Sequence, residues 1–324
     1  MVPFKQIQIA STERSAQPRT AVFVGATSGI GLAAVEALLK SSKGSTVFIV
    51  GRSKLKFAET RSRLQQIDSK AKITFLEAQI SLLSEVERVC ATISRQVTSL
   101  DSLWLSQGGL GLRESHGVTS EGLPVDFAVS YYGRILFMHR LAPLLNNSSD
   151  GQVLSVLCAG MEGPINISDP GLRDEKNYAA AGFWGAQKQG VTMQSLAMRR
   201  LAEENPTISF IHTNPGVVGT DVHQKWSTSF TGVWTPVAWL IRLVMIPLMH
   251  LVAFTPERAG ETGLFELMDE KFSSSSGTNF FRLDDCAEVL EGKEDDVLSR
   301  YGEDNTEEKI WEHTLGVFES VLAR

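Results

Sequence analysis

A short apolar run near the start of this sequence leads straight into a glycine-rich turn. Residues 21–24 are apolar, and the next seven are Gly25-Ala26-Thr27-Ser28-Gly29-Ile30-Gly31, in the spacing GxxxGxG. Gly25 permits a tight turn, Gly29 lets the backbone approach a pyrophosphate, and Gly31 allows a helix to pack closely on a sheet. A helix opening at Ser28 or Gly29 would also present free N–H groups to that anion. The residues predicted to meet a dinucleotide are Gly25, Thr27, Ser28, Gly29, Ile30 and Gly31.

Up to residue 215 the sequence alternates short runs rich in β-branched residues with longer helical patterns. This alternation predicts an α/β fold in which βαβ units form a Rossmann-type, doubly wound parallel sheet with right-handed crossovers. The expected strands are 21–24, 46–50, 73–76, 102–105, 153–157 and 208–212. The expected helices are 30–39, 54–67, 83–97, 121–145 and 180–204.

The residue after the second expected strand indicates which nicotinamide cofactor is used. About 20 residues beyond the glycine turn, an NAD-binding enzyme places an acidic side chain on the ribose 2′-hydroxyl. This chain has Gly51-Arg52 there. A guanidinium can hold a 2′-phosphate through forked, charge-assisted hydrogen bonds, whereas a carboxylate would repel it. We therefore predict NADP(H) with Arg52 at the 2′-phosphate; the alternative is that Arg52 is a solvated surface side chain.

Charge and cysteine content exclude several other classes. A net charge of −6 and a pI near 5.6 provide no basic surface for a phosphate backbone, so nucleic acid is not expected as a partner. The three cysteines, Cys90, Cys158 and Cys286, are widely spaced and form no CxxC pair. This usage fits a reducing compartment and predicts neither disulfides nor a metal site. Because residues 1–19 lack the pattern of a signal peptide, we expect a cytoplasmic protein.

The pattern changes after residue 215. Residues 233–254 are strongly apolar but contain Pro236, Arg242, Pro247 and His250, which argue against a membrane-spanning helix. They are expected to form a flap over a substrate or, alternatively, a segment with weak contact to a membrane surface. A helix at 256–269, a turn at 273–276 and a seventh strand at 278–281 follow.

The end of the chain carries apolar residues at helical spacing within an acidic tail. They are Ile310, Trp311, Leu315, Phe318, Val321 and Leu322, and a helix docked on the core is expected. The predicted organisation is an N-terminal arm (1–19), a single Rossmann domain (20–283) that includes the apolar flap (217–254), and an acidic helical extension (284–324). A homo-oligomer is left open, since this extension could block a packing surface.

With these features the chain resembles the short-chain dehydrogenase/reductases over about residues 20–283. Pro215-Gly216-Val217-Val218-Gly219-Thr220 resembles the PGxVxT segment of that family, and the likeness implies that Pro215, Gly216, Val218 and Thr220 meet the nicotinamide end of the cofactor. Residues 255–260 resemble the helix start that closes the flap in retinol-dehydrogenase-like members. The stretches 105–109, 130–134, 155–160 and 209–218 resemble a divergent group common in fungal secondary metabolism. The family's NNAG has become Ser106-Gln107-Gly108-Gly109, which implies that Gly108 lies at the cofactor.

The resemblance also implies a catalytic set that this chain lacks. The family uses a tyrosine acid/base, a lysine four residues later, a serine and an asparagine, because a phenol of pKa near 10 needs a nearby cation to exchange protons. None of the four tyrosines here is followed by lysine at that spacing. The family's tyrosine and lysine fall on Phe183 and Gln187, or on Gly182 and Ala186.

Substitutes for the lost residues can be named. The serine position falls on Cys158, or on Leu157 if the frame slips, and the asparagine position falls on Ser130. Cys158 is also interpreted as a small buried apolar residue, and His212 as a core or cofactor-adjacent residue. Tyr178 could act with Lys188 if the helix start between them is irregular. Tyr131 or Tyr132 could instead reach the substrate, with the other in the core.

Three functions follow from this pattern. The first is a reductase or dehydrogenase that moves hydride between NADP(H) and a bulky, lipophilic carbonyl or imine, in secondary metabolism; orientation alone can support such chemistry when the proton relay is weak. The second is a non-redox cyclase, isomerase or dehydratase that uses the same pocket. The third is a cofactor-binding protein without catalysis.

Overall fold

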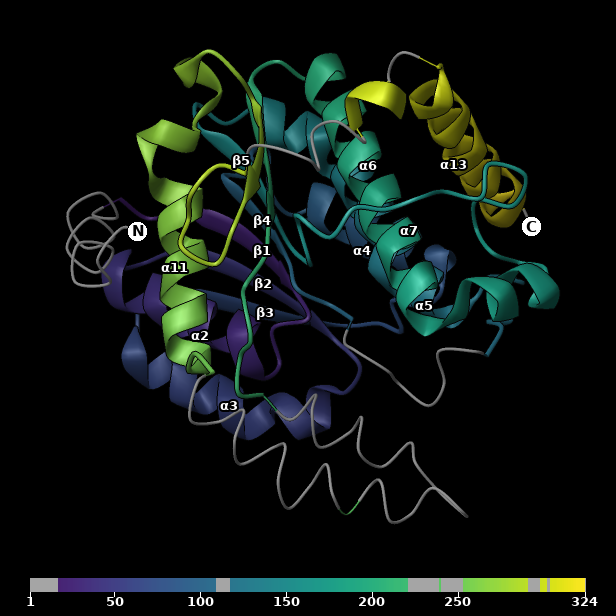
Figure 1. Cartoon of the computed structure of the whole chain (residues 1–324). Helices are drawn as coiled ribbons and strands as arrows, with labels where there is room; N and C mark the ends of the chain where they lie inside the picture. Colours follow the sequence, from purple (N-terminus) through teal and green to yellow (C-terminus); the bar gives the residue numbers. More distant parts are fainter. Residues whose placement is uncertain are drawn as a thin grey trace.

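The fold is a seven-stranded parallel sheet covered by helices on both faces (Figure 1). The computed structural model describes residues 17–108, 117–220, 239, 253–290, 298–301 and 304–323. All strand pairs are parallel, in the order β3-β2-β1-β4-β5-β6-β7. The strands are β1 (Thr20–Val24), β2 (Thr46–Gly51), β3 (Lys72–Glu77), β4 (Ser102–Leu105), β5 (Gly151–Val156), β6 (Ile208–Thr213) and β7 (Phe280–Leu283). The predicted α/β Rossmann class is confirmed.

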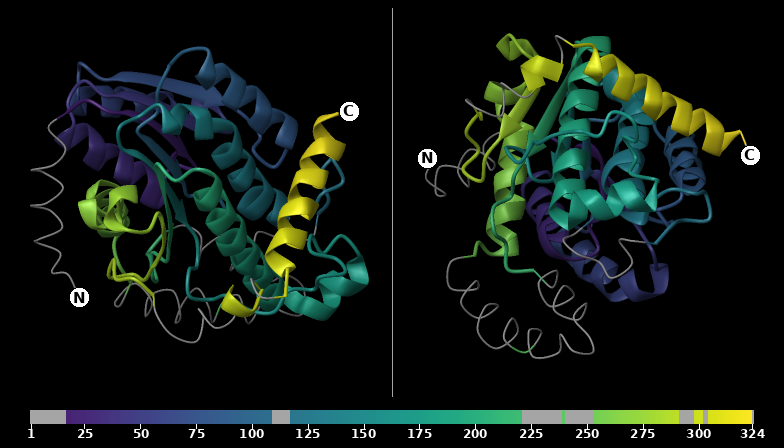
Figure 2. Two further views of the ribbon diagram at one scale, coloured as in Figure 1. Left: turned by 90° about the horizontal axis from the view of Figure 1, so that it is seen from above. Right: turned by 45° about the vertical axis from the view of Figure 1, so that its right-hand side comes forward.

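Two hydrophobic layers hold the helices to this sheet. One contains apolar side chains of α2 (Gly29–Ser41), α3 (Lys54–Ile67) and α11 (Pro256–Met268). The other contains those of α4 (Leu83–Ser94), α6 (Gly133–Asn146), α7 (Glu175–Glu204) and α13 (Thr306–Leu322). Figure 2 shows the two groups of helices on opposite faces. Because both faces are covered, the strands are almost continuously apolar.

Successive strands are added on one side of β1 up to β3 and on its other side from β4 onward, and this reversal predicts where a ligand binds. β1 pairs with β2 on one side and with β4 on the other, so the connections leaving these strands diverge. In open α/β sheets, ligands bind beside the carboxyl ends of the strands at this switch point. Val24 pairs with both Val50 and Leu105, and the loops after these residues meet at one edge.

Two long helices expected from the sequence are interrupted. The expected helix 121–145 consists of α5 (Val125–Phe127), a π-helical turn η1 (Ala128–Tyr132) and α6. α7 begins at Glu175, before the expected residue 180, and is broken at Gly182, whose φ of 64° and ψ of 175° are not helical. The apolar pattern continues through both interruptions, so hydrophobic periodicity did not reveal them. π-helical turns often occur at functional sites.

The expected C-terminal helix is confirmed as α13. Its apolar face packs on α4 and α7, and it buries Ile310, Trp311 and Phe318. Arg199 of α7 forms an ion pair with Glu307 at its start. Among the described residues, no helix is both long and apolar enough to cross a membrane. Most of the expected flap (217–254), which includes the 233–254 segment expected to contact a membrane surface, lies outside the described residues. Residues 1–16 of the expected arm also lie outside them.

Candidate functional site

The glycine-rich turn lies against the end of β4. Gly25 has a φ of +79°, and a Cβ there would lie 2.7 Å from the Cα of Gln107. A Cβ on Gly31 would lie 2.6 Å from the Ser106 hydroxyl oxygen. Both contacts are too short for a side chain, so these glycines are needed for the loops after β1 and β4 to meet. This contact puts the start of α2 beside the topological switch point.

The first turn of α2 is suited to bind an anion. Ser28, its N-cap residue, is exposed, and its side chain makes no capping hydrogen bond. The backbone N–H groups at the start of the helix are therefore left for a ligand. Gly29 has a φ of +58°, and a Cβ at this position would face the Thr220 methyl group at 3.4 Å. The structure thus brings together the segment expected at the pyrophosphate and the segment expected at the nicotinamide end of the cofactor.

The end of β2 completes this side of the site. A Cβ on Gly51 would lie 2.5 Å from the methyl carbon of Thr27, so β2 ends in contact with the glycine-rich turn. Arg52 follows directly and is exposed, as are Lys54 and Lys56 in the next helix. Glu77, at the end of β3, accepts a hydrogen bond from the Lys54 backbone N–H at 2.8 Å. The end of β2 is therefore followed by three exposed cationic side chains, with the Glu77 carboxylate beside them.

A buried arginine holds the loop that follows β4. Arg134 of α6 is 1% exposed and donates hydrogen bonds to the Leu105 carbonyl at 2.9 Å, the Ser155 hydroxyl at 2.6 Å and the Gln107 carbonyl. Burial lowers its pKa to about 9, which still leaves the guanidinium charged at neutral pH. It joins the ends of β4 and β5 and fixes the turn after β4, where a Cβ on Gly108 would lie 3.8 Å from Arg134.

Two of the predicted catalytic residues meet at an aspartate. The Tyr178 hydroxyl donates to Asp126 Oδ2 at 2.7 Å, and the Ser130 hydroxyl donates to the Asp126 carbonyl at 2.5 Å. Ser130 lies on the π-helical turn, and its Cβ would be 3.9 Å from a Cβ on Gly108. Asp126 is therefore held at both ends, with its carbonyl bound by Ser130 and its carboxylate bound by Tyr178. Such a pair of phenol and carboxylate can pass a proton between its members.

The other predicted catalytic residues lie elsewhere. The irregular helix start required to join Tyr178 with Lys188 is present at Gly182. Lys188, however, is exposed. The stem of its side chain lies against Gly163, where a Cβ would be 3.2 Å from the Lys188 Cβ. Tyr178, in contrast, is buried on Asp126. Cys158 is half-buried at the end of β5. Burial raises its pKa, the Arg134 charge lowers it and Glu162 raises it further, so a reactive thiolate is not favoured.

Tyr131 and Tyr132 face the C-terminal helix rather than a pocket. Both rings are fully buried. The Tyr131 hydroxyl is 2.6 Å from the Thr314 hydroxyl, and the Tyr132 hydroxyl is 2.8 Å from His313 Nε2. Burial raises the pKa of both phenols. We therefore assign both tyrosines to the core, in place of the expectation that one of them reaches the substrate.

Behind the strand ends lies a buried polar network. Ser195 Oγ donates to Glu162 Oε1 at 2.8 Å and lies 2.8 Å from His212 Nδ1, and Glu162 pairs with Arg282 at 3.2 Å. Since the only proton of Ser195 goes to Glu162, His212 Nδ1 carries the proton of their shared bond. Burial and the charges of Arg134 and Arg282 lower the pKa of His212 to about 3, so the ring is neutral.

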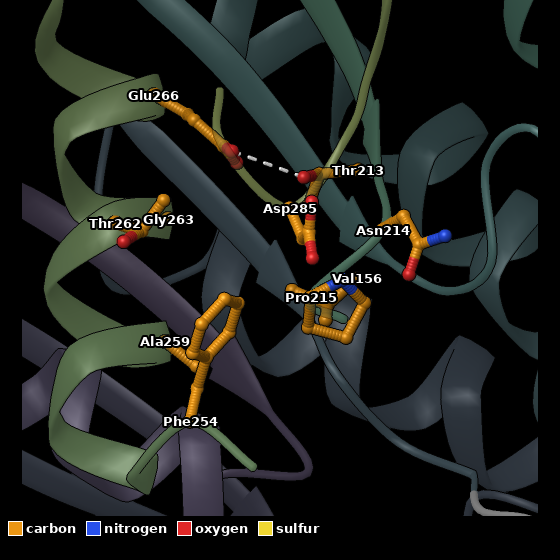
Figure 3. A pocket seen from close by; sticks show the side chains of 10 residues that line it. All are labelled: Val156, Thr213, Asn214, Pro215, Phe254, Ala259, Thr262, Gly263, Glu266 and Asp285. Atoms are coloured by element: carbon orange, nitrogen blue, oxygen red, sulfur yellow. Dashed lines mark hydrogen bonds between the residues drawn. The ribbon is translucent and has the colours of Figure 1, made fainter. Parts of the chain in front are cut away.

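A narrow pocket lies between α11 and the Pro215–Gly216 turn (Figure 3). Glu266 projects into it from α11, and Oε1 of this carboxyl group accepts a hydrogen bond from Thr213 at 3.0 Å. Burial, together with the charge of Asp284, raises the pKa of Glu266 to about 8. The other lining residues are Val156, Asn214, Pro215, Phe254, Ala259, Thr262, Gly263 and Asp285. Gly216, expected at the cofactor, and buried Val218 belong to the turn beside this pocket.

Sequence reasoning missed Asp126, Arg134 and Glu266 as members of the site. Arg134 had a detectable signal, because it is a single charge in the apolar run Gly133–Met138 and such a charge must find partners when buried. Asp126 had none, since its partner Tyr178 is 52 positions away.

Comparisons with known proteins agree with this geometry. The sequence pattern of the short chain dehydrogenase family matches residues 19–230. The chain is 31% identical to oxidoreductase AN1596 of Emericella nidulans, with 100% of both chains covered. It is also 31% identical to oxidoreductase lepF of Aspergillus flavus, covering 93% of this chain and 91% of that protein.

A solved structure shares the fold. L-sorbose reductase from Gluconobacter frateurii, determined in complex with NADPH and L-sorbose, superimposes with a TM-score of 0.58 at 15% identity and covers 86% of this chain and 99% of that one. The glycine-rich turn at the switch point, the seven-stranded parallel sheet and the family match over most of the chain lead to one conclusion. The protein is a member of the short chain dehydrogenase family and an oxidoreductase by its relatives.

Proposed function

We propose that this protein is an NADP(H)-dependent oxidoreductase that moves hydride between the nicotinamide and a lipophilic carbonyl or imine. The observation that carries the cofactor choice is the position of Arg52, which directly follows the residue of β2 that contacts Thr27 in the glycine-rich turn. An arginine at this edge favours a 2′-phosphate, and a free 2′-hydroxyl would leave the guanidinium without that partner. The NADPH complex of the L-sorbose reductase is consistent with this choice.

The residues present fit such a cofactor. The uncapped first turn of α2 would hold the pyrophosphate, Arg52 the 2′-phosphate, and the segment from Pro215 to Thr220 the nicotinamide end. NADPH, when bound, supplies the hydride. The fixed charge of Arg134 holds the loop after β4 at this end of the site through the carbonyls of Leu105 and Gln107. The protein thus contributes orientation and a preset electrostatic field.

We assign the proton transfer to Tyr178 with Asp126. In the oxidation direction, the Tyr178 oxygen accepts the proton of a substrate hydroxyl while its own proton passes to Asp126 Oδ2, 2.7 Å away. In the reduction direction both transfers reverse, and Asp126 starts protonated. This pair would replace the missing tyrosine and lysine, and Ser130 fixes its geometry through the Asp126 carbonyl. Lys188, which is exposed, is left without a role in the step.

Exposed apolar side chains support a lipophilic substrate. Large apolar residues follow the ends of β5 and β6, at the edge of the sheet where the site lies. They are Met161, Ile167, Trp184 and Val217, each at least 36% exposed. Since parallel strands end at one edge, Met161 and Val217, which follow β5 and β6 within about five residues, are placed at this edge of the sheet. We propose a bulky apolar metabolite as the substrate.

A panel of lipophilic ketones, aldehydes and cyclic imines tests this proposal. Each would be incubated with the protein and NADPH, and NADPH oxidation would be compared with the mass of the product. We expect one NADPH consumed for each product that gains two hydrogens. A product formed without NADPH consumption would contradict the redox assignment and support the non-redox alternative. The observation that favours this alternative is that no tyrosine of the chain has a lysine four residues later.

A further inference from the structure

The pocket behind the Pro215–Gly216 turn holds a buried carboxylate oxygen that lacks a partner. Glu266 is 1% exposed, and its Oε1 accepts the bond from Thr213. Its Oε2 is buried and, within the described part of the chain, has no hydrogen-bond partner. A buried carboxyl oxygen without a hydrogen-bond partner is destabilising. A ligand that binds this oxygen therefore explains the pocket better than an empty space does.

A second carboxyl group lines the same pocket. Asp285, just after β7, lies against the cofactor turn, since a Cβ on Gly216 would be 2.8 Å from Asp285 Oδ2. Its carboxylate also lies within 4.8 Å of ligand atoms of Asp284 and Cys286. Figure 3 shows Glu266 and Asp285 entering the pocket from α11 and from the segment after β7.

The pocket provides oxygen atoms and no positive side chain among its described lining residues. The Thr213 hydroxyl, which donates to Glu266, and the Thr262 hydroxyl also line the pocket, whereas the Asn214 amide is bound to the Gly216 N–H and the Ala159 carbonyl. Arg258, the arginine of α11, stacks on the Phe254 ring with its guanidinium carbon 3.8 Å from the ring centroid. Oxygen donors with two carboxylates are the ligand set preferred by hard cations such as Mg²⁺, Ca²⁺ and Mn²⁺. The cavity, about 10 Å³, has room for one ion or one water molecule.

We propose that a hard divalent cation binds between Glu266 and Asp285, behind the Pro215–Gly216 turn. The ion would be bound by Glu266 Oε2 and the Asp285 carboxylate, and any proton that Glu266 carries would be released to solvent on binding. It would tie α11 and the segment after β7 to the turn expected to meet the nicotinamide. Binding would therefore stabilise the fold and hold this turn in place, whatever substrate the protein takes.

Manganese binding tests this site without any enzyme assay. The full-length protein would be stripped with EDTA and titrated with MnCl₂, and free Mn²⁺ would be measured by electron paramagnetic resonance. We expect one site per chain, competed by MgCl₂ and CaCl₂. We also expect Glu266→Gln and Asp285→Asn each to weaken binding by roughly tenfold or more, since each removes one charged ligand. The matched control Glu319→Gln, a distant exposed acid on α13, should bind as the wild type does.

Two outcomes would overturn the proposal. Absence of binding to the wild-type protein would mean that the cavity holds a water molecule only. Binding that is unchanged in Asp285→Asn would place the ion elsewhere; this partly exposed position is the deciding one if Glu266→Gln fails to fold. Neither outcome bears on NADP(H) use, which is measured separately.

Discussion

The Tyr178 hydroxyl lies 2.7 Å from Asp126 Oδ2, although the two residues are 52 positions apart. The family's proton donor relies on a lysine one helical turn away, whereas this tyrosine has a carboxylate partner. The break at Gly182 separates the first turns of α7, which carry Tyr178, from the regular helix beyond. The π-helical turn in the neighbouring segment holds Ser130 on the Asp126 carbonyl.

Removing either member of this pair should slow turnover. We expect Tyr178→Phe and Asp126→Asn each to lower kcat by about 10²- to 10⁴-fold, the usual contribution of general acid–base catalysis. Because the groups act as a unit, the double variant should be little worse than the poorer single variant. Tyr132→Phe is the matched control, since its hydroxyl contacts only His313 among the described hydrogen bonds. Equal activity in Tyr178→Phe and Tyr132→Phe would refute the assignment.

The choice of NADPH over NADH should depend on Arg52. Loss of a charge-assisted bond costs about 1.5–3 kcal/mol, so Arg52→Glu should weaken NADPH binding by roughly 10- to 100-fold and change NADH binding little. Arg61→Glu makes the same charge change at an exposed position of α3 and serves as the control. Dissociation constants from nucleotide fluorescence would show the difference. The 2′-phosphate argument fails if Arg52→Glu weakens both nucleotides equally.

Acid should destabilise the protein partly through His212. Its pKa in the folded state, about 3, lies below the ordinary value of 6.5. The unfolded chain therefore takes up a proton as the pH falls through 6.5 and the folded chain does not, so stability present above pH 6.5 is lost toward pH 3. Between pH 7 and pH 5 this contribution is about 2 kcal/mol. Urea unfolding at both pH values should show a smaller loss in His212→Gln, and equal losses would contradict the prediction.

The buried ion pair between Glu162 and Arg282 should be sensitive to the loss of one partner. Arg282→Met leaves the Glu162 carboxylate uncompensated and should lower the free energy of unfolding by about 3–5 kcal/mol. The double variant Glu162→Gln with Arg282→Met should be less destabilised, because no charge is left buried. Arg200→Met, at a partly exposed ion-pair position, should cost no more than about 1 kcal/mol. A double variant as unstable as the sum of the two single variants would show that the charges do not interact.

Much of the fold was predictable because its causes are local. Runs such as 46–50 are apolar enough to be buried on both faces, and the glycine-rich turn after β1 fixes where the first helix starts. All seven strands lie where the sequence indicates them, within about three residues.

The reaction site was less predictable because its contacts join distant segments. Tyr178 was selected as a substitute acid, but its partner Asp126 cannot be found from spacing, and Lys188 was selected only because a lysine was needed. Tyr131 lies next to Ser130 in sequence but faces Thr314 on α13, a helix 183 positions away. Hydrophobic periodicity did not detect the π-helical turn on which both residues lie.

Titration of the protein with NADPH by calorimetry tests the central claim, that the glycine-rich turn and its surroundings bind NADPH. The account predicts one site per chain in the wild-type protein. Gly29→Trp should abolish this binding while leaving a cooperative unfolding transition, because the side chain would fill the space in front of α2 and the Thr220 methyl group. No heat of binding to the wild-type protein, or equal binding to Gly29→Trp, would contradict it.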